Sequence, residues 1–417
     1  MKTLIKNIKS LVNTEDNHRK WVAGNEMSKL NTIDNAYLII SEDKIDDFGK
    51  MEDLQEIPEA EKTIDATGKM VFPSFCDSHT HLVYAGSREI EYGDKIRGLS
   101  YEEIAKRGGG ILNSAKRLHE TSEDSLYEQS LQRVKEIIQL GTGAVEIKSG
   151  YGLTVEDELK MLRVIKRLKE NTPVTITSTF LGAHSIPSEY KDDPDKYVDV
   201  VVNEMIPEVG KENLAEFVDV FCDRGFFTVE QTERILEASA KYGMKPKIHA
   251  NELDFSGGIQ VGVKHGALSV DHLEYTGDKE INELFKSDTM PTLLPGAALF
   301  LGLINPPARD MIQAGLPIAL ASDYNPGSSP SGNMKLIMSL GTIKLKMLPE
   351  EVIHATTING AYAMGLNDTH GSIAKGKKAN LFITKEIPSY EFMPYAYGSY
   401  LIDKPILNGE IQQSLDQ

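Results

Sequence analysis

Short apolar runs that end in potential metal ligands are spaced along this chain like the repeating units of a parallel barrel. His79 and His81 follow the first run, and later runs end at His249, His272 and Asp323. His249 to His272 is about one strand-plus-helix unit and His272 to Asp323 about two, at roughly 25 to 35 residues each in a barrel of about 250 residues plus insertions. The C-terminal ends of barrel strands share one face, where this fold keeps its chemistry. The spacing therefore predicts a (β/α)8 barrel, in which these side chains meet.

The His79 and His81 pair strengthens this prediction, because residues two apart on a strand point to the same side. Three histidines and one aspartate from this set would form a nitrogen-rich site that suits zinc, and iron or nickel nearly as well, with one position left for water. Each residue taken singly has a simpler explanation. A lone histidine is often a hydrogen-bonded core residue, and Asp323 could cap a helix or turn, since Asn-Pro-Gly follows at 325–327. The ordered combination favours a metal site.

The remaining pattern divides the chain into two domains. Apolar residues recur every three or four positions in three helical stretches between the apolar runs, at 125–140, 155–170 and 228–242. Alternation of strands and helices is typical of a parallel sheet. Both chain ends instead show short strands and turns, including a hairpin signal at Asn408-Gly409. We expect an α/β barrel over residues 71–371, and a small β-sandwich-like domain from residues 1–70 together with 372–417.

Composition limits the partners and the compartment. A net charge of −17 and a pI near 5.1 argue against nucleic acid and anionic membranes, whose phosphates would be repelled. The only cysteines, Cys76 and Cys222, give no disulfide framework, which fits a reducing cytoplasm. No apolar run reaches the roughly 18 residues of a membrane span, and the N-terminal apolar stretch is too short for a signal peptide. We expect a cytoplasmic protein that acts on a small anionic molecule, and the sequence is compatible with a homodimer.

Five motifs are spread over most of the chain, at residues 73–88, 145–152, 179–184, 247–252 and 323–330. Together, and in this order, they resemble the motifs of imidazolonepropionases, in the amidohydrolase superfamily. The histidine pair alone indicates only the superfamily, whereas Ala-Gly-Ser-Arg, Lys-Ser-Gly-Tyr-Gly and Asp-Tyr-Asn-Pro-Gly-Ser together are specific to one activity. Three positions depart from the family pattern. Ser74 replaces a usual glycine, and Asn251 and Asn380 replace usual aspartates; we expect Ser74 and Asn380 to be structural, and Asn251 to affect a supporting contact.

The resemblance implies hydrolysis of the ring amide of 4-imidazolone-5-propanoate to N-formimidoyl-L-glutamate, a step of histidine degradation. It also implies one divalent or trivalent transition metal per chain, zinc or iron. The implied metal ligands are His79, His81, His249 and Asp323. The implied catalytic residues are Glu252, His272 and Asp323. The implied substrate contacts are Arg88, Tyr101, Tyr151, His184, Asn325, Gly327 and Ser328.

The chemistry of these residues suits that reaction. Glu252, three positions after a ligand histidine, is expected to transfer protons, and His272 to stabilise an oxyanion. The guanidinium of Arg88 is expected to bind the propanoate, since it can pair with a carboxylate through two hydrogen bonds. The glycines at 108–110 lack the setting of a phosphate-binding loop and are expected to form a loop over the substrate. The division of proton transfers among Glu252, His272 and Asp323 stays open.

Two alternative functions are considered. A deaminase or another cyclic amidohydrolase could use the same metal ligands, but a neutral base would not require Arg88, Tyr151 and His184. A non-catalytic barrel serving as an assembly subunit should have lost ligands, and here the whole set is present. Ring hydrolysis is therefore the favoured function.

Overall fold

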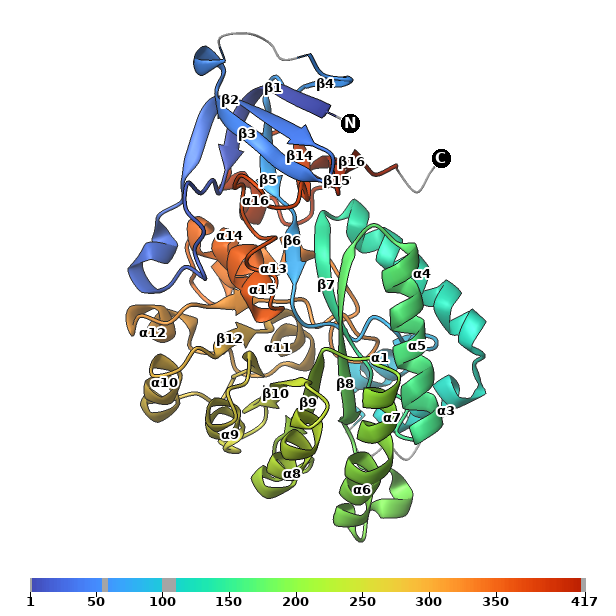
Figure 1. Cartoon of the computed structure of the whole chain (residues 1–417). Helices are drawn as coiled ribbons and strands as arrows, with labels where there is room; N and C mark the ends of the chain where they lie inside the picture. The colour runs from blue at the N-terminus through green and yellow to red at the C-terminus, as the bar shows by residue number, and fades with distance from the viewer. Residues whose placement is uncertain (1, 55–58, 100–109, 414–417) are drawn as a thin grey trace.

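The computed structural model describes residues 2–54, 59–99 and 110–413. One of its two sheets has eight parallel strands whose order in space follows their order in the sequence (Figure 1). They are β6 (Phe75–Asp77), β7 (Thr142–Lys148), β8 (Thr175–Ala183), β9 (Phe217–Cys222), β10 (Lys245–Ala250), β11 (Ser269–His272), β12 (Met290–Leu293) and β13 (Ala319–Leu320). All of their residues are buried except at the starts of β8 and β10, as expected for strands covered on both faces. The predicted barrel is confirmed.

The barrel closes just beyond the ends of its first and last strands. Thr80 and Tyr324 form a parallel bridge. Two backbone hydrogen bonds flank this bridge. The amide of Asp323 donates to the carbonyl of His79 at 3.0 Å, and the amide of His81 donates to the carbonyl of Tyr324 at 3.0 Å. The buried carboxyl of Asp77 accepts hydrogen bonds from the amide and hydroxyl of Ser322, at 2.9 and 2.5 Å. This seam brings residues from opposite ends of the barrel sequence together.

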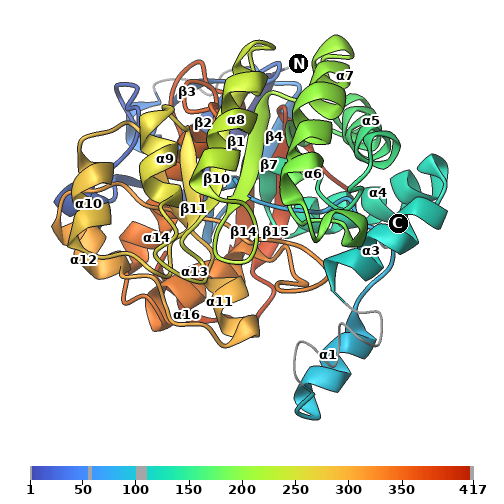
Figure 2. The ribbon, with the colours of Figure 1, turned by 90° about the horizontal axis from the view of Figure 1, so that it is seen from below.

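Helices surround the strands (Figure 2). The predicted helical stretches are α4 (Glu123–Gln139), α5 (Val155–Asn171) and α8 (Val229–Ala240). Thr228 begins α8 with a capping box to Gln231, which satisfies amides that the first turn leaves free. The others are α1 (Glu89–Ile96), α3 (Ile111–Glu120), α6 (Pro194–Val200), α7 (Ile206–Lys211), α9 (Gly258–Lys264), α10 (Asp278–Phe285), α11 (Pro295–Leu301), α12 (Ala308–Gln313), α13 (Met334–Ile343), α14 (Pro349–Thr356), α15 (Ile358–Ala363) and α16 (Phe392–Tyr395).

Both chain ends form a second, mixed sheet above the barrel (Figure 1). Its strands are β1 (Lys2–Val12), β2 (Thr32–Ser41), β3 (Lys44–Lys50), β4 (Lys62–Asp65), β5 (Lys69–Pro73), β14 (Leu381–Glu386), β15 (Ile402–Leu407) and β16 (Glu410–Ile411). Asn408 and Gly409 both have positive φ, at 51° and 79°, so the predicted hairpin is present. The pairing changes from this sheet to the barrel between β5 and β6. The domain limits at 70/71 and 371/372 stay a prediction.

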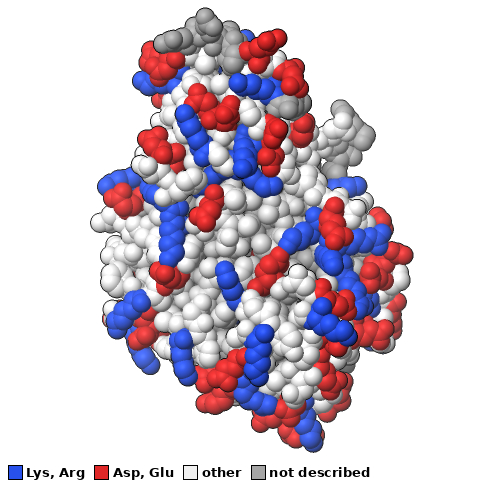
Figure 3. Space-filling model, in the orientation of Figure 1, with Lys and Arg blue, Asp and Glu red and all other residues white. Residues whose placement is uncertain are grey.

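The surface carries both signs of charge. On the face shown in Figure 3, acidic and basic side chains occur together over both the mixed sheet and the barrel helices. Among the described residues, the helices are all too short or too polar to span a membrane. Cys76 and Cys222 are buried and unpaired.

Candidate active site

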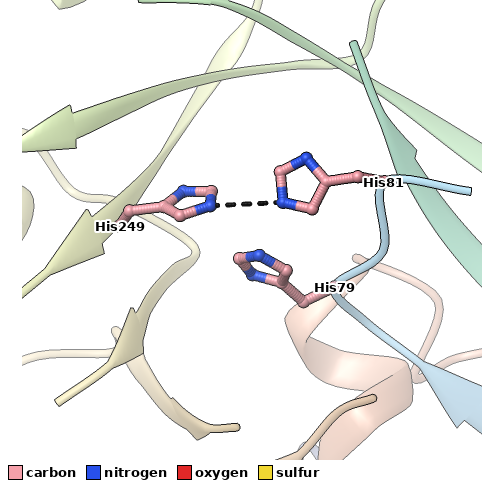
Figure 4. A group of neighbouring side chains, drawn as sticks. All are labelled: His79, His81 and His249. Atoms are coloured by element: carbon pink, nitrogen blue, oxygen red, sulfur yellow. Dashed lines mark hydrogen bonds between the residues drawn. The ribbon is translucent and has the colours of Figure 1, made fainter. Parts of the chain in front are cut away.

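Three histidines converge at the ends of two barrel strands. His79 and His81 follow β6, and His249 lies near the end of β10 (Figure 4). One nitrogen of each lies within 4.8 Å of the others, and the Nε2 atoms of His81 and His249 are 3.4 Å apart. All three residues are at most 2% exposed. In the described part of the chain, these three side chains form the one group that could hold a single metal ion, with one ligand atom from each residue.

The predicted fourth ligand, Asp323, lies beside this group. Its Oδ1 is 3.6 Å from Nε2 of His79 and 3.5 Å from Nε2 of His81. Burial raises the pKa of Asp323 to about 6. Burial, followed by the nearby Lys148 and His249, lowers the pKa of His79 well below its usual range, so this imidazole is neutral at pH 7.

The unsatisfied atoms fit a metal. Nε2 of His79 is buried and has no hydrogen-bond partner among the described residues. A buried polar atom without a partner is costly unless another species satisfies it. Neutral imidazoles and a carboxylate are the donor set that zinc and iron accept. The residues present therefore fit a transition metal.

Two buried aspartates orient the histidines from behind. Nδ1–H of His79 donates to Oδ2 of Asp271 at 2.6 Å, and Nδ1–H of His249 donates to Oδ2 of Asp219 at 2.9 Å. With Nδ1 protonated, each Nε2 keeps a lone pair for a metal. Neither Asp219 nor Asp271 was predicted as a site residue from the sequence. The available signal was their position on buried strands next to β10.

A cavity of about 780 Å³ opens over the histidines. Among the predicted residues, it is lined by His81, Arg88, Tyr151, His184, His249, Glu252, His272, Asp323, Asn325, Gly327 and Ser328. Tyr101 and the predicted covering loop at 108–109 lie outside the described residues. Gly110, just beyond that loop, lines the cavity and precedes α3. The fold thus gathers the described candidates around one space large enough for a small-molecule ligand.

Glu252 and His272 lie next to each other in this cavity. Oε2 of Glu252 is 3.8 Å from Nδ1 of His272. Burial, with Asp323 and Asp223 nearby, raises the pKa of Glu252 to about 8. The backbone of His272 is left-handed, with φ of 84°, a strained conformation that often marks functional sites.

Glu274 is a further acidic residue beside His272, and it was not predicted from the sequence. Its Oε2 is 3.9 Å from Nδ1 of His272, and its side chain is 0% exposed. Burial, and then Glu252, raise the pKa of Glu274 well above its usual range. Only its place two residues after His272 could have suggested it.

Arg88 is held at the wall of the cavity by Glu91. Its Nε and Nη2 each lie 2.8 Å from Oε2 of Glu91. Glu91 also accepts from the amide of Gly110 at 2.9 Å and from Asn113 at 3.0 Å. A side chain at Gly327 would place its Cβ 2.2 Å from Nη1 of Arg88. Gly327 therefore leaves room for the guanidinium. Glu91 was not predicted from the sequence, because no motif marks it.

The loop after β13 shapes the wall near Asp323. Asn325 donates to the carbonyl of Asp323 at 2.6 Å and to the hydroxyl of Ser328 at 2.7 Å, and its Oδ1 accepts from the amides of Gly327 and Ser328. The hydroxyl of Ser328 donates to Oδ2 of Asp323 at 3.2 Å. These bonds fix the loop, and with it the carboxyl of Asp323.

Tyr151 and His184 form another part of the cavity wall. The ring of His184 stacks on His81, with centroids 5.0 Å apart, and lies 5.4 Å from the ring of Tyr151. Nδ1–H of His184 donates to the carbonyl of Gly150 at 3.0 Å. Burial lowers the pKa of His184 to about 3. A neutral imidazole with Nδ1 engaged leaves Nε2 as an acceptor.

The departures from the family pattern have structural contacts. Asn251 donates to the carbonyl of Tyr275 at 2.8 Å and has a φ of 55°, a conformation that asparagine tolerates better than most residues. Asn380 donates to the carbonyl of Gly143 and accepts from the amide of Asn408. These hydrogen bonds connect the mixed sheet to β7 of the barrel. The Ser74 side chain occupies the space beside Gly143.

The fold and the histidine cluster together define the class of protein. Residues 70–411 match the model of the amidohydrolase family, and the chain belongs to that family. Among solved structures, Escherichia coli guanine deaminase is similar over 99% of each chain with a TM-score of 0.75 and 15% identity. An adenosine deaminase from Xanthomonas campestris with bound zinc is similar over 98% of this chain and 92% of its own, with a TM-score of 0.72 and 15% identity. These two similarities concern the fold.

Curated relatives give a narrower comparison. The imidazolonepropionase of Christiangramia forsetii is 58% identical over 99% of this chain and 100% of its own length. The imidazolonepropionase of Geobacillus sp. strain WCH70 is 43% identical over 98% of this chain and 97% of its own. The resemblance inferred from the motifs is therefore confirmed.

Proposed function

We propose that the protein is an imidazolonepropionase, which hydrolyses the ring amide of 4-imidazolone-5-propanoate to N-formimidoyl-L-glutamate in histidine degradation. The observation that carries this proposal is the 58% identity to an imidazolonepropionase over essentially the full length of both chains. The cavity supports it, because a histidine cluster, acidic side chains and an arginine face the same space. Hydrolysis of a ring with an anionic side chain requires a metal site, a proton-transfer group and a cation, and these residues can supply all three.

Zinc or iron is the proposed metal, one ion per chain, with His79, His81, His249 and Asp323 as ligands. The orphaned Nε2 of His79 and the closeness of Asp323 to two of the histidines support this set. When bound, such a metal lowers the pKa of water toward about 7 and polarises a carbonyl oxygen.

The protein's own residues then manage the protons. Glu252 accepts a proton from the attacking water and passes it to the ring nitrogen that leaves as the amide C–N bond breaks. Its raised pKa, about 8, suits both halves of that transfer near neutral pH. His272, at the same wall, donates a hydrogen bond to the oxygen that gains negative charge. Asp323 is the competing proton acceptor.

Arg88 is the proposed binding group for the propanoate, with Tyr101, Tyr151, His184, Asn325, Gly327 and Ser328 as the further contacts. Glu91 and Gly327 support this role, because they position the guanidinium at the wall of the cavity. Preorganised charge reduces the cost of ordering a side chain on binding. The anionic substrate would thus meet a local cation in a protein with a net charge of −17.

Arg88→Met is expected to lower kcat/KM by the equivalent of about 2 to 5 kcal/mol, because the partly buried substrate carboxylate loses its charged partner. Steady-state kinetics and metal analysis would measure this, and metal content should not change. Arg117→Met is the matched control, since Arg117 holds the carbonyl of Ser87 in the same region but does not line the cavity. Equal losses with the substrate and with an analogue lacking the carboxylate would show that Arg88 supports the fold instead.

A turnover assay on metal-loaded protein tests the activity itself. Loss of the imidazolone absorbance should accompany formation of N-formimidoyl-L-glutamate, identified by mass spectrometry. Absence of turnover by protein that holds a full complement of metal would overturn the proposal. Release of ammonia from an aminated heterocycle, without ring opening, would instead indicate a deaminase.

We also propose that the enzyme works in the cytoplasm. The two buried cysteines without a disulfide support this location. A homodimer is the proposed assembly, supported by the exposed apolar side chains Ile90 and Ile96 on α1. Analytical ultracentrifugation would decide between monomer and dimer.

A further inference from the structure

A buried ammonium group lies behind the histidine cluster. Nζ of Lys148, at the end of β7, is 2.8 Å from Oδ2 of Asp219 and 3.8 Å from Oδ2 of Asp271. These are the same oxygens that accept the Nδ1–H groups of His249 and His79. One cation therefore contacts both carboxylates that orient the histidines.

The ammonium belongs to a larger buried cluster. Glu146 accepts from Lys148 at 2.6 Å, pairs with Lys247 and accepts from the hydroxyl of Thr179. The five charged side chains are all 0% exposed. Two ammonium groups thus face three carboxylates, beneath a site built for a cation.

The two lysines have different positions in this cluster. Besides Glu146, Lys247 donates to the backbone carbonyls of Ser78 and Ala363, at 2.9 and 3.1 Å. In the described part of the chain, Lys247 forms an ion pair with Glu146. Of the two lysines, only Lys148 also forms ion pairs with Asp219 and Asp271. Glu146 and Lys148 are two residues apart on β7, so both side chains point to the barrel interior.

We infer that Lys148 is a positioning residue for the metal site: its ammonium fixes Asp219 and Asp271, and through them the ring orientation of His249 and His79. The inference rests on the histidine metal site of the proposed function.

The other atoms of the two carboxylates show how closely they are held. Oδ1 of Asp219 accepts from the amide of His249 at 3.0 Å, and Oδ1 of Asp271 accepts from the hydroxyl of Ser269 at 2.6 Å. On each aspartate, the histidine ring and the ammonium of Lys148 both contact the other oxygen, Oδ2. Removing the ammonium leaves two neighbouring buried anions that repel each other, and each can turn away from its histidine. Loss of such outer contacts typically weakens metal binding by about 10- to 100-fold.

The experiment compares two double variants with equal changes in buried charge. Lys148→Met with Glu146→Gln removes one cation and one anion and takes the ammonium away from both aspartates. Lys247→Met with Glu146→Gln removes the same charges but keeps Lys148 in place. The dissociation constant for Zn²⁺ is measured on metal-free protein by competition with a chromophoric chelator, and thermal unfolding of the same metal-free samples reports on the fold.

The Lys148 double variant is expected to bind Zn²⁺ about 10- to 100-fold more weakly than wild type, and the Lys247 double variant to keep wild-type affinity. Equal weakening in both, or wild-type affinity in the Lys148 variant, would overturn the inference. If methionine prevents folding, the corresponding lysine-to-glutamine pairs, whose amides still donate hydrogen bonds, make the same comparison. Failure of the wild-type protein itself to bind Zn²⁺ would overturn the proposed metal site, and with it this inference.

Discussion

Glu252→Gln is expected to lower kcat by about 10²- to 10⁴-fold, the usual contribution of a positioned acid–base group. Glutamine has nearly the same shape but cannot take up or release the proton. Glu252 lines the cavity and is not part of the three-histidine group, so metal content should stay at the wild-type level. Stopped-flow turnover and elemental analysis on the same preparation would measure both quantities.

The pH dependence of the rate gives a second readout. The carboxylate of Glu252 is the base, and it forms as the pH rises through the group's pKa, about 8 in the metal-free protein. The positive charge of a bound metal would move that value lower. In wild type, kcat/KM should therefore increase with pH on the acidic side of the profile, and Glu252→Gln should lose this dependence.

His272→Ala is the contrasting variant. Loss of an oxyanion donor should cost about 10²- to 10³-fold in kcat, while the acidic limb of the pH profile is retained. Near-wild-type turnover in Glu252→Gln would transfer the role of base to Asp323, whose pKa burial raises to about 6.

His249→Ala is expected to abolish both stoichiometric metal binding and activity. This side chain supplies one of the three converging nitrogens and lies 3.4 Å from Nε2 of His81. Without it the proposed ligand set loses one of its three imidazole nitrogens, the donors that zinc and iron favour, so the ion is no longer held at a stoichiometric level. Inductively coupled plasma analysis of the purified variant would measure the metal.

Two controls accompany this variant. Removal of metal from wild type with a chelator should abolish turnover, and addition of Zn²⁺ or Fe²⁺ should restore it. His119→Ala changes a histidine whose side chain is 71% exposed and pairs with Asp157 outside the cavity, and it should keep full metal content. A fully active protein without metal, or His249→Ala with a full complement, would refute the proposed metal site.

The sequence alone determined the architecture and most of the residues around the cavity. His79, His81, His249, His272 and Asp323 stand at or just after the ends of apolar runs, and the periodic spacing of those runs specifies a barrel. Strand ends converge in this fold regardless of loop details. The hairpin signal at Asn408-Gly409 was equally readable, because a tight turn depends on residues close in sequence.

Only the tertiary structure decided which groups support those residues. Asp219, Asp271 and Lys148 come from three different strands and contact one another through the barrel interior. Glu91, which holds Arg88, is also tied to Gly110 and Asn113 of a later segment. Such partnerships depend on strand register and on side-chain packing between distant segments, and a local pattern does not encode either one. The sequence thus determined which side chains reach the cavity, and the closed barrel determined how each is oriented and charged.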